Sequence, residues 1–183
     1  ILNASKLARA LEVSAQSINR YIDLLVDLLL VRRLPPYHTN IGKRLVKSPK
    51  IYVRDSGLVH ALLGLETFEQ VLKHPISGMS WEGFVLETLL SVLPWRATAF
   101  FYRTAVGAEI DLLIEHNDGT LWAIEIKRSA SATLQRGFYQ ACEDLKPARA
   151  FVVHAGQERY PISETVEAIS VSELATELIN LSQ

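Results

Sequence analysis

The sequence contains a single cysteine, Cys142, so no disulfide within the chain can stabilise the fold. A reducing, cytoplasmic location is therefore the expectation. Cys142 follows Ala141 in a helical pattern, which favours a small core residue over a nucleophile or a metal ligand. With 49% hydrophobic residues among 183, the chain can bury a core without covalent cross-links.

Long apolar runs and nucleotide-binding motifs are also missing. The longest apolar run, residues 24–31, is interrupted by Asp27 and is far too short to span a bilayer. No signal-peptide pattern opens the chain, so we expect no membrane partner. No G-x-x-x-x-G-K-[ST] motif occurs, because Gly42-Lys43 lacks the upstream glycine, and the chain is not expected to bind ATP by itself. The chain does not begin with Met and starts in helical sequence, so we expect an excerpt of a longer polypeptide.

The net charge of -1 hides an uneven distribution along the chain. Residues 1–54 hold ten Lys or Arg and three acids, which gives +7. Residues 55–183 hold nine bases and seventeen acids, which gives -8. A small basic unit before a larger acidic one indicates two domains, of which the basic one is a candidate for nucleic-acid binding.

The N-terminal unit has a helix-turn-helix pattern. Leu7, Ala8 and Leu11 share one face of a first helix, and Ser14 is a plausible N-cap for a second. In the second helix the apolar residues repeat at helical spacing, at Ile18, Ile22, Leu25 and Leu29. Pro35-Pro36, a polar hairpin tip over residues 39–44 and a strand over 50–53 follow. We therefore predict a winged helix-turn-helix over residues 1–54.

Two surfaces of this predicted winged helix would meet DNA. A recognition helix would present Gln16, Ser17, Asn19 and Arg20 to bases, and the wing would present Lys43, Arg44 and Lys47 to phosphates. The alternative is that the unit packs against a neighbouring domain and its lysines are merely solvated. Asp23, on the same face of the second helix, would repel phosphate.

The rest of the chain predicts a helical connector and an α+β domain. Residues 55–76 carry short helices, the first capped by Asp55. From residue 77 to 183 the order is αβββαβ, with a helix at 80–93, strands at 97–103, 108–116 and 120–127, a helix at 132–145 and a strand at 149–154. A short strand at 166–169 and a helix at 172–181 complete the domain.

Two strands of this domain combine carboxylates with apolar residues, in GAEIDLLIEHNDGTLWAIEIKRS at residues 107–129. A three-residue hairpin loop ending at Gly119 would pair His116 with Thr120. Counting back pairs Ile114 with Trp122, Leu112 with Ile124 and Ile110 with Ile126. The same register sets Asp111 opposite Glu125 and Glu109 opposite Lys127.

Facing carboxylates repel each other, and a divalent cation would remove that cost. Mg²⁺ or Mn²⁺ takes oxygen ligands, and a nearby lysine can position the attacking water in phosphodiester hydrolysis. The alternative is a solvated sheet face on which Glu109 and Lys127 form an ordinary cross-strand pair. Glu82 falls inside the apolar stripe of the preceding helix, so it needs a partner, either the same metal or a hydrogen bond or ion pair such as one to Arg103.

In order and spacing, these residues resemble the PD-(D/E)xK core of restriction-endonuclease-like nucleases, although Ile110 replaces the proline. The resemblance implies catalytic Asp111, Glu125 and Lys127, with Glu82, Asp111 and Glu125 as metal ligands. It also makes Glu109 and Gln140 auxiliary candidates.

Nearly the whole chain resembles the C-terminal half of a group of prokaryotic AAA-family P-loop ATPases of unknown function. The resemblance rests on the segments LARALEVSAQSINRYIDLL, KRLVKSPKIYVRDSGLVHALLG, WEGFVLETLL, YRTAVGAEIDLLIE and AIEIKRS. It implies a winged helix followed by a nuclease-like domain of unknown function, with an ATPase domain in cis that would supply ATP binding.

Three functions are open at this point. The chain is a Mg- or Mn-dependent DNA nuclease to which the winged helix delivers substrate, or a catalytically silent module that binds DNA or protein for the ATPase. In the third, the winged helix serves only as a docking surface. The acidic charge of residues 55–183 weakens attraction for DNA outside the winged helix.

Overall fold

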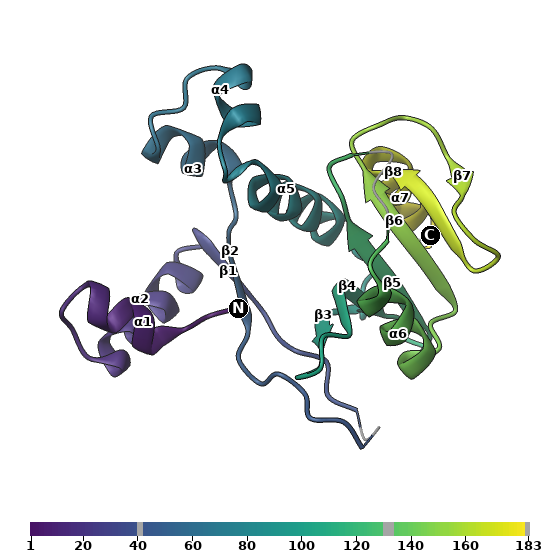
Figure 1. Ribbon diagram of the computed structural model, residues 1–183, viewed down its shortest axis with the longest axis horizontal. Coiled ribbons are helices and arrows are strands. Elements are labelled where there is room, and N and C mark those ends of the chain that lie inside the picture. The colour runs from purple at the N-terminus through teal and green to yellow at the C-terminus, as the bar shows by residue number, and fades with distance from the viewer. Residues whose placement is uncertain (40–41, 130–133, 182–183) are drawn as a thin grey trace.

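The structure is a computed structural model that describes residues 1–39, 42–129 and 134–181. Within these residues the fold is α+β, with seven helices, a two-stranded sheet and a six-stranded sheet (Figure 1). The elements are α1 Ala4–Ala10, α2 Ala15–Asp27, β1 Val31–Leu34, β2 Lys50–Val53, α3 Ser56–Leu62, α4 Phe68–Lys73, α5 Ser77–Ser91, β3 Thr98–Arg103, β4 Glu109–Glu115, β5 Leu121–Ile126, α6 Arg136–Leu145, β6 Arg149–His154, β7 Tyr160–Pro161, β8 Val166–Ser170 and α7 Val171–Asn180.

The N-terminal unit contains the predicted pair of helices. Ser14 caps α2 by accepting a hydrogen bond from the Ser17 amide, as predicted. Ala8, Ile18 and Ile22 form a small buried core between α1 and α2. The predicted apolar stripes extend too far, because Leu7, Leu11 and Leu29 are exposed. Leu29 lies beyond the end of α2 with a left-handed φ of 59°, so it cannot continue the helical face.

The segment between β1 and β2, which the sequence predicts to be a wing, packs along the large sheet. The Tyr37 amide donates to the Phe101 carbonyl at 2.7 Å, and the Val46 amide donates to the Arg103 carbonyl at 2.9 Å. Both acceptors belong to β3, the edge strand of the six-stranded sheet. An edge strand has unpaired backbone groups. The segment between β1 and β2, which we call the arm, forms hydrogen bonds with some of them. Residues 40–41, within the predicted hairpin tip, lie outside the described residues.

The connector consists of α3 and α4, and both helices have polar caps. Asp55 caps α3 through the amides of Gly57 and Leu58, as predicted. Thr67 and Gln70 form a capping box at the start of α4. These caps explain why two helices of seven and six residues form at all, since such short helices are marginal on their own.

The six-stranded sheet has the order β3-β4-β5-β6-β8-β7 and is mixed, with parallel pairing between β5, β6 and β8. Helices α5 and α7 cover one face, where Val85, Leu86, Leu89, Leu174 and Leu178 are fully buried. Helix α6 covers the opposite face through Phe138 and Ala141. The predicted αβββαβ order is present from α5 to β6.

The predicted register of β4 and β5 is confirmed next to the turn. Leu112 pairs with Ile124, and Ile114 pairs with Trp122. The His116 amide donates to the Thr120 carbonyl at 2.9 Å, and Gly119 has a φ of 81°. A residue with a Cβ would be strained in this left-handed conformation, so the glycine selects the three-residue loop.

Farther from the turn the predicted register is wrong, because β4 contains a bulge. Phe100 pairs with Leu113 but Tyr102 pairs with Ile110, so two residues of β4, Asp111 and Leu112, lie opposite one residue of β3. Ile110 consequently joins the core beneath α6, whereas Leu112 joins the core beneath α5. The ladder with β5 ends at Leu112, and the pairs Ile110–Ile126, Asp111–Glu125 and Glu109–Lys127 do not form.

An ion pair network joins the N-terminal unit to α5. The Glu87 carboxylate accepts hydrogen bonds from Arg32 of β1, at 2.9 Å from Nη2, and from Arg54, at 3.0 Å from Nε. Glu87 lies at helical spacing from Gly83 and Ser91, on the side of α5 that carries fewer apolar residues. That side is covered by the N-terminal unit, which leaves the Glu87 side chain 13% exposed.

No helix in the described ranges is long and apolar enough to cross a membrane.

Gly137 lies where α6 approaches the β3–β4 turn. A Cβ at this position would overlap the carbonyl oxygen of Gly107. We expect Gly137→Ala to lower the free energy of unfolding by about 1–3 kcal/mol, because backbone must shift to make room. Urea unfolding measures the change. The control is Gly78→Ala in α5, where nothing lies within 4 Å of the added Cβ and the change should be neutral or stabilising by up to about 1 kcal/mol. Equal losses in both variants would contradict this account of the contact.

Candidate functional site

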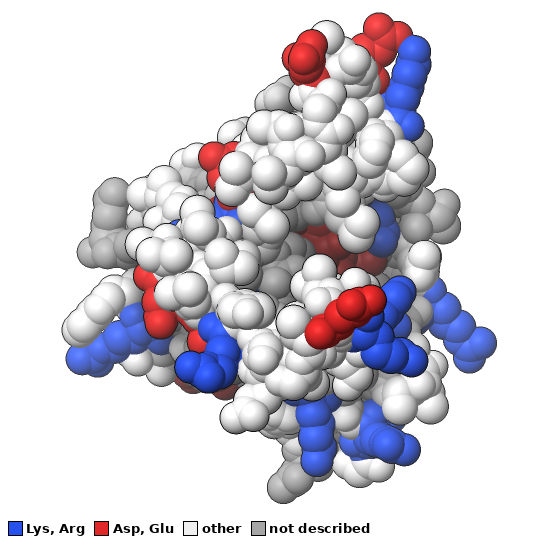
Figure 2. Space-filling view, turned by 90° about the vertical axis from the view of Figure 1, so that its left-hand side faces the viewer, with Lys and Arg blue, Asp and Glu red and all other residues white. Residues whose placement is uncertain are grey.

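A cleft of about 790 Å³ opens between α5, the starts of β2 and β4, the end of β5 and the start of α6. Figure 2 shows this recess from outside, with acidic side chains at its bottom and basic side chains at its margin. Four carboxylates line it, and we call them the carboxylate cluster: Glu82, Glu109, Asp111 and Glu125. Four basic residues line it too: Lys50, Arg103, Lys127 and Arg128.

The β-bulge determines where the Asp111 carboxylate points. Its Oδ2 accepts a hydrogen bond from the Ile126 amide of β5 at 3.1 Å, beyond the last ladder pair. The side chain therefore satisfies a backbone donor that has lost its strand partner. Its other oxygen, Oδ1, faces the cleft and accepts from Lys50 at 2.9 Å.

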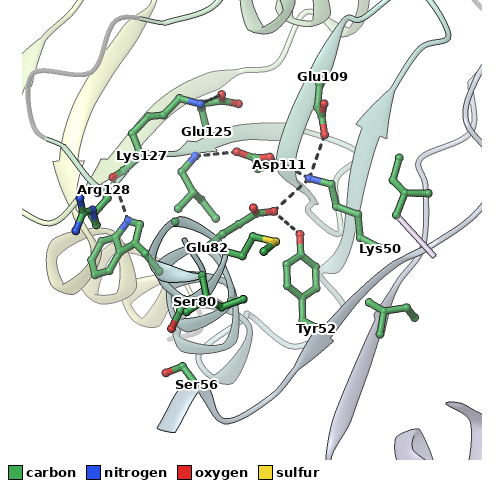
Figure 3. Close-up of a pocket in the computed structure, with 18 of the residues that line it drawn as sticks. Lys50, Tyr52, Ser56, Ser80, Glu82, Glu109, Asp111, Glu125, Lys127 and Arg128 are labelled. Carbon is green, nitrogen blue, oxygen red and sulfur yellow. Dashed lines mark hydrogen bonds and ion pairs between the residues drawn. The ribbon is translucent and has the colours of Figure 1, made fainter. Parts of the chain in front are cut away.

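The other predicted catalytic and metal-binding residues lie around Asp111 (Figure 3). The Glu125 side chain, only 8% exposed, accepts a hydrogen bond from Lys127 Nζ at 2.5 Å. Glu82 reaches the cleft from α5, and its Oε1 accepts from the Tyr52 hydroxyl at 2.5 Å. The tertiary fold thus brings residues 82, 111, 125 and 127 into one cleft, from a helix and two strands.

Lys50, the first residue of β2, occupies the centre of the cluster. Its Nζ lies 2.9 Å from Asp111 Oδ1, 3.2 Å from Glu109 Oε1 and 3.3 Å from Glu82 Oε1. The residue is 7% exposed, and its Nζ lies 5.6 Å from the centroid of the Phe101 ring. Figure 3 shows the ammonium between the three carboxylates. Glu109 also pairs with Arg103 at 3.2 Å, rather than with Lys127.

Lys50 is not among the site residues predicted from the sequence. The one local signal is the alternation in Lys50-Ile51-Tyr52-Val53, which places Lys50 and Tyr52 on the same side of a strand. Both side chains do bind Glu82. Sequence alone does not reveal that this side faces α5, because the strand and the helix belong to different predicted domains.

Charge and burial shift the pKa values of this group. Burial lowers the pKa of Lys50, but the negative charges of Asp111, Glu82 and Glu109 outweigh it and raise the pKa above its ordinary value. Burial, together with the charge of Asp111, raises the pKa of Glu125 to about 7 despite the hydrogen bond from Lys127. Because its pKa is raised, Lys50 carries a positive charge at neutral pH.

As arranged, these residues do not fit a divalent metal ion. Mg²⁺ requires oxygens at about 2.0–2.1 Å, and the point toward which Asp111 and Glu82 converge holds the ammonium of Lys50. Glu125 is turned toward Lys127. In the part of the chain that the structure describes, no three His, Cys, Asp or Glu side chains are placed to hold a metal together.

Gln140 lies apart from this group. Its Nε2 donates to Glu143 at 3.1 Å on the same helix, and of the described residues of α6 it is Gly137 and Phe138 that line the cleft. Gln135, just before α6, also lines the cleft. A glutamine that lines the cleft is therefore present, but at the N-cap of α6 rather than at the predicted position.

The predicted nucleic-acid-binding residues differ in how far their side chains are exposed to solvent. Gln16, Asn19 and Arg20 are exposed on α2, whereas Ser17 is half-buried. On the arm between β1 and β2, Arg44 and Lys47 are exposed. Lys43 instead forms an ion pair with Asp144 of α6 at 2.5 Å.

Two family models match the chain. One, described as a domain of unknown function, DUF4143, matches residues 77–174, which are 98 of the 183 residues. The chain belongs to the DUF4143 family. The other model, described as a domain of unknown function, DUF8612, matches residues 1–69.

Curated relatives of this DUF4143 protein occur in mycobacteria. This chain is 41% identical over 176 residues to an uncharacterized protein of Mycobacterium tuberculosis and to one of Mycobacterium bovis. The alignments cover 96% of this chain and 40% of each relative, so the chain spans about two fifths of their length. No solved structure shows a significant match.

The uneven charge of the DUF4143 chain is partly neutralised inside the molecule. Four of the ten bases in residues 1–54 bind acids of the C-terminal unit, namely Arg32, Lys43, Lys50 and Arg54. Arg33 pairs with Asp23 at 2.6 Å, which removes the repulsion of phosphate expected from an unpaired aspartate on α2. The other five of these ten bases form no ion pair with a described residue, and all five are exposed: Lys6, Arg9, Arg20, Arg44 and Lys47.

The raised pKa of Glu125 predicts a pH-dependent stability. Between the ordinary carboxyl pKa and about 7 the folded protein binds a proton that the unfolded chain releases, so this contribution to stability is lost as pH rises through that window. Glu125→Gln removes the ionisation. From about pH 5 to about pH 8 we expect the variant to gain about 1–3 kcal/mol relative to the parent protein.

Urea unfolding across this pH range measures that difference. Glu69→Gln, at an exposed carboxylate of α4, is the control and should give no such trend. A difference between the Glu125→Gln variant and the parent that stays constant with pH would contradict the raised pKa.

Proposed function

We propose that this chain is the nucleic-acid-binding region of a longer protein, and that its nuclease-like domain holds nucleic acid without cutting it. The N-terminal unit would act as a winged helix-turn-helix, and the C-terminal unit would be a PD-(D/E)xK-like domain whose ion site is taken by lysine. The single observation that carries the proposal of a domain that does not cut is the ammonium of Lys50 among Glu82, Glu109 and Asp111.

Binding by the N-terminal unit is supported by the bases that remain after internal pairing. Arg20 lies on α2 with exposed Gln16 and Asn19, so a cation and two amide side chains share the helix that would enter a groove. Lys6 and Arg9 lie on α1, and Arg44 and Lys47 lie on the arm, where they would contact phosphates. Lys43, which pairs with Asp144, would not take part.

The C-terminal unit supports a nuclease-like ancestry of the fold through its element order and its residues. The supporting residues are Asp111 on β4, Glu125 on β5, Lys127 directly after β5 and Glu82 on the preceding helix, which all line one cleft. Arg103 and Arg128, at the cleft, are placed to contact phosphates of a bound strand.

A second candidate is a Mg- or Mn-dependent DNA nuclease. One observation favours it, which is the gathering of Asp111, Glu125 and Lys127 in a cleft of about 790 Å³. Cleavage through a metal would require Lys50 to leave the cluster, and this is why we place the silent module first.

The longer protein is proposed to be an AAA-family ATPase. The supporting facts are the resemblance of the sequence segments and the length of the mycobacterial relatives, of which this chain covers 40%. ATP would then bind to a domain outside the present sequence, and the winged helix would couple that domain to nucleic acid.

The N-terminal contribution predicts which lysines and arginines matter for DNA. We expect Arg20→Ala and Lys47→Ala each to weaken binding to a fluorescent DNA duplex about 3- to 10-fold, and to lower the slope of affinity against salt by about one. Fluorescence anisotropy at several salt concentrations measures both quantities. The control is Lys73→Ala on α4, whose side chain is 75% exposed and pairs with Glu69. Equal affinities for all three variants and the parent would refute DNA binding by this unit.

A plasmid assay separates the silent module from the nuclease. With Mg²⁺ or Mn²⁺ present, we expect the parent chain, Asp111→Ala and Lys127→Ala to leave supercoiled DNA equally intact, because the cluster holds Lys50 in place of a metal. Agarose gels report nicked and linear products. Metal-dependent nicking by the parent that both substitutions abolish would establish the nuclease instead.

A further inference from the structure

The cation at the centre of the carboxylate cluster comes from the other unit of the molecule. Lys50 is part of the β1–β2 sheet, where it pairs with Leu34, whereas the three carboxylates it contacts belong to α5 and β4. Contacts on several sides therefore hold the ammonium: three carboxylate oxygens at 2.9–3.3 Å, and the Phe101 ring.

We propose that the Lys50 ammonium is the resident cation of this cluster, so that the chain as folded takes up no divalent metal there. Removing the ammonium would turn the same carboxylates into a site for Mn²⁺ or Mg²⁺. The N-terminal unit thereby determines the metal affinity of the C-terminal unit. This inference rests on the part of the proposed function in which lysine takes the ion site, and it does not depend on whether the chain binds nucleic acid.

Geometry makes the ammonium and a metal ion mutually exclusive. A metal bound to Asp111 Oδ1 and Glu82 Oε1 would have to lie about 2.0–2.2 Å from each oxygen, between them. Lys50 Nζ already lies between these oxygens, at 2.9 and 3.3 Å. Both cations would share one small volume and repel each other at contact distance.

Charge balance leads to the same conclusion. Four carboxylates of the cluster face three cations, Lys50, Lys127 and Arg103, and each of these cations forms an ion pair with a member of the cluster. A cluster whose net charge is close to zero attracts a divalent ion only weakly. Without Lys50, four carboxylates face two cations, and the excess negative charge attracts a hard divalent ion with oxygen ligands.

The first test compares the parent protein with Asp111→Asn. Binding of Mn²⁺ is counted from the electron paramagnetic resonance signal of the free ion, and the thermal unfolding midpoint is recorded with and without Mn²⁺. We expect the same Mn²⁺ binding in both proteins and no Mn²⁺-dependent rise of the midpoint in either. Mn²⁺ binding by the parent protein that Asp111→Asn abolishes would overturn the proposal.

The second test uses Lys50→Met, which keeps an unbranched apolar stem and removes the charge. We expect its dissociation constant for Mn²⁺ to be lower than that of the parent by about tenfold or more, since one unit of positive charge has left the site. Adding Mn²⁺ should also raise its unfolding midpoint. The double variant Lys50→Met/Asp111→Asn should lose both effects, and Lys73→Met should behave as the parent does. Unchanged Mn²⁺ affinity in folded Lys50→Met would refute the proposal.

Circular dichroism establishes whether Lys50→Met folds. If it does not fold in the absence of metal, the comparison of the parent with Asp111→Asn decides the question alone. A failure to bind DNA leaves these measurements unaffected, so the metal inference and the proposed DNA binding succeed or fail separately.

Discussion

The ammonium of Lys50 makes three ion pairs that join the N-terminal unit to the carboxylates of the cleft. Glu82, Glu109 and Asp111 approach one another closely enough to share it, at 2.9–3.3 Å. Removing one partner of a buried ion pair costs about 3–5 kcal/mol, because the remaining charge stays desolvated. The Lys50 side chain therefore contributes strongly to the packing of β2 against α5 and β4, together with the hydrogen bond from Tyr52 to Glu82, and it sets the chemistry available in the cleft.

Charge counted along a sequence is a poor guide to partners when two segments fold against each other. The +7 of residues 1–54 indicates a nucleic-acid surface, and the -8 of the remainder indicates its opposite. Half of those ten bases lie in ion pairs inside the molecule, four of them with the acidic unit. What remains for an external partner is the exposed set on α1, α2 and the arm, and that set is what the proposed DNA binding rests on.

Local signals predicted the elements well. Caps at Ser14 and Asp55 mark helix starts, and Gly119 marks a hairpin loop, because each depends on groups within a few residues of itself. The register next to the turn follows from the same loop. The face of Ile110 could not be predicted, because the bulge at Asp111 and Leu112 depends on pairing with β3, a contact between separate strands.

The candidate site divides in the same way. Residues 82, 111, 125 and 127 could be identified from sequence, since a carboxylate in an apolar stripe or strand stands out against its neighbours. Lys50, Tyr52 and the burial of Glu87 could not, because each results from the docking of the N-terminal unit onto α5. The sequence by itself determined which segments become helices and strands and which acids face inward, through hydrogen bonds and periodicity within short stretches. Only the tertiary structure decided which cation meets those acids, because that choice depends on contacts between residues more than thirty positions apart.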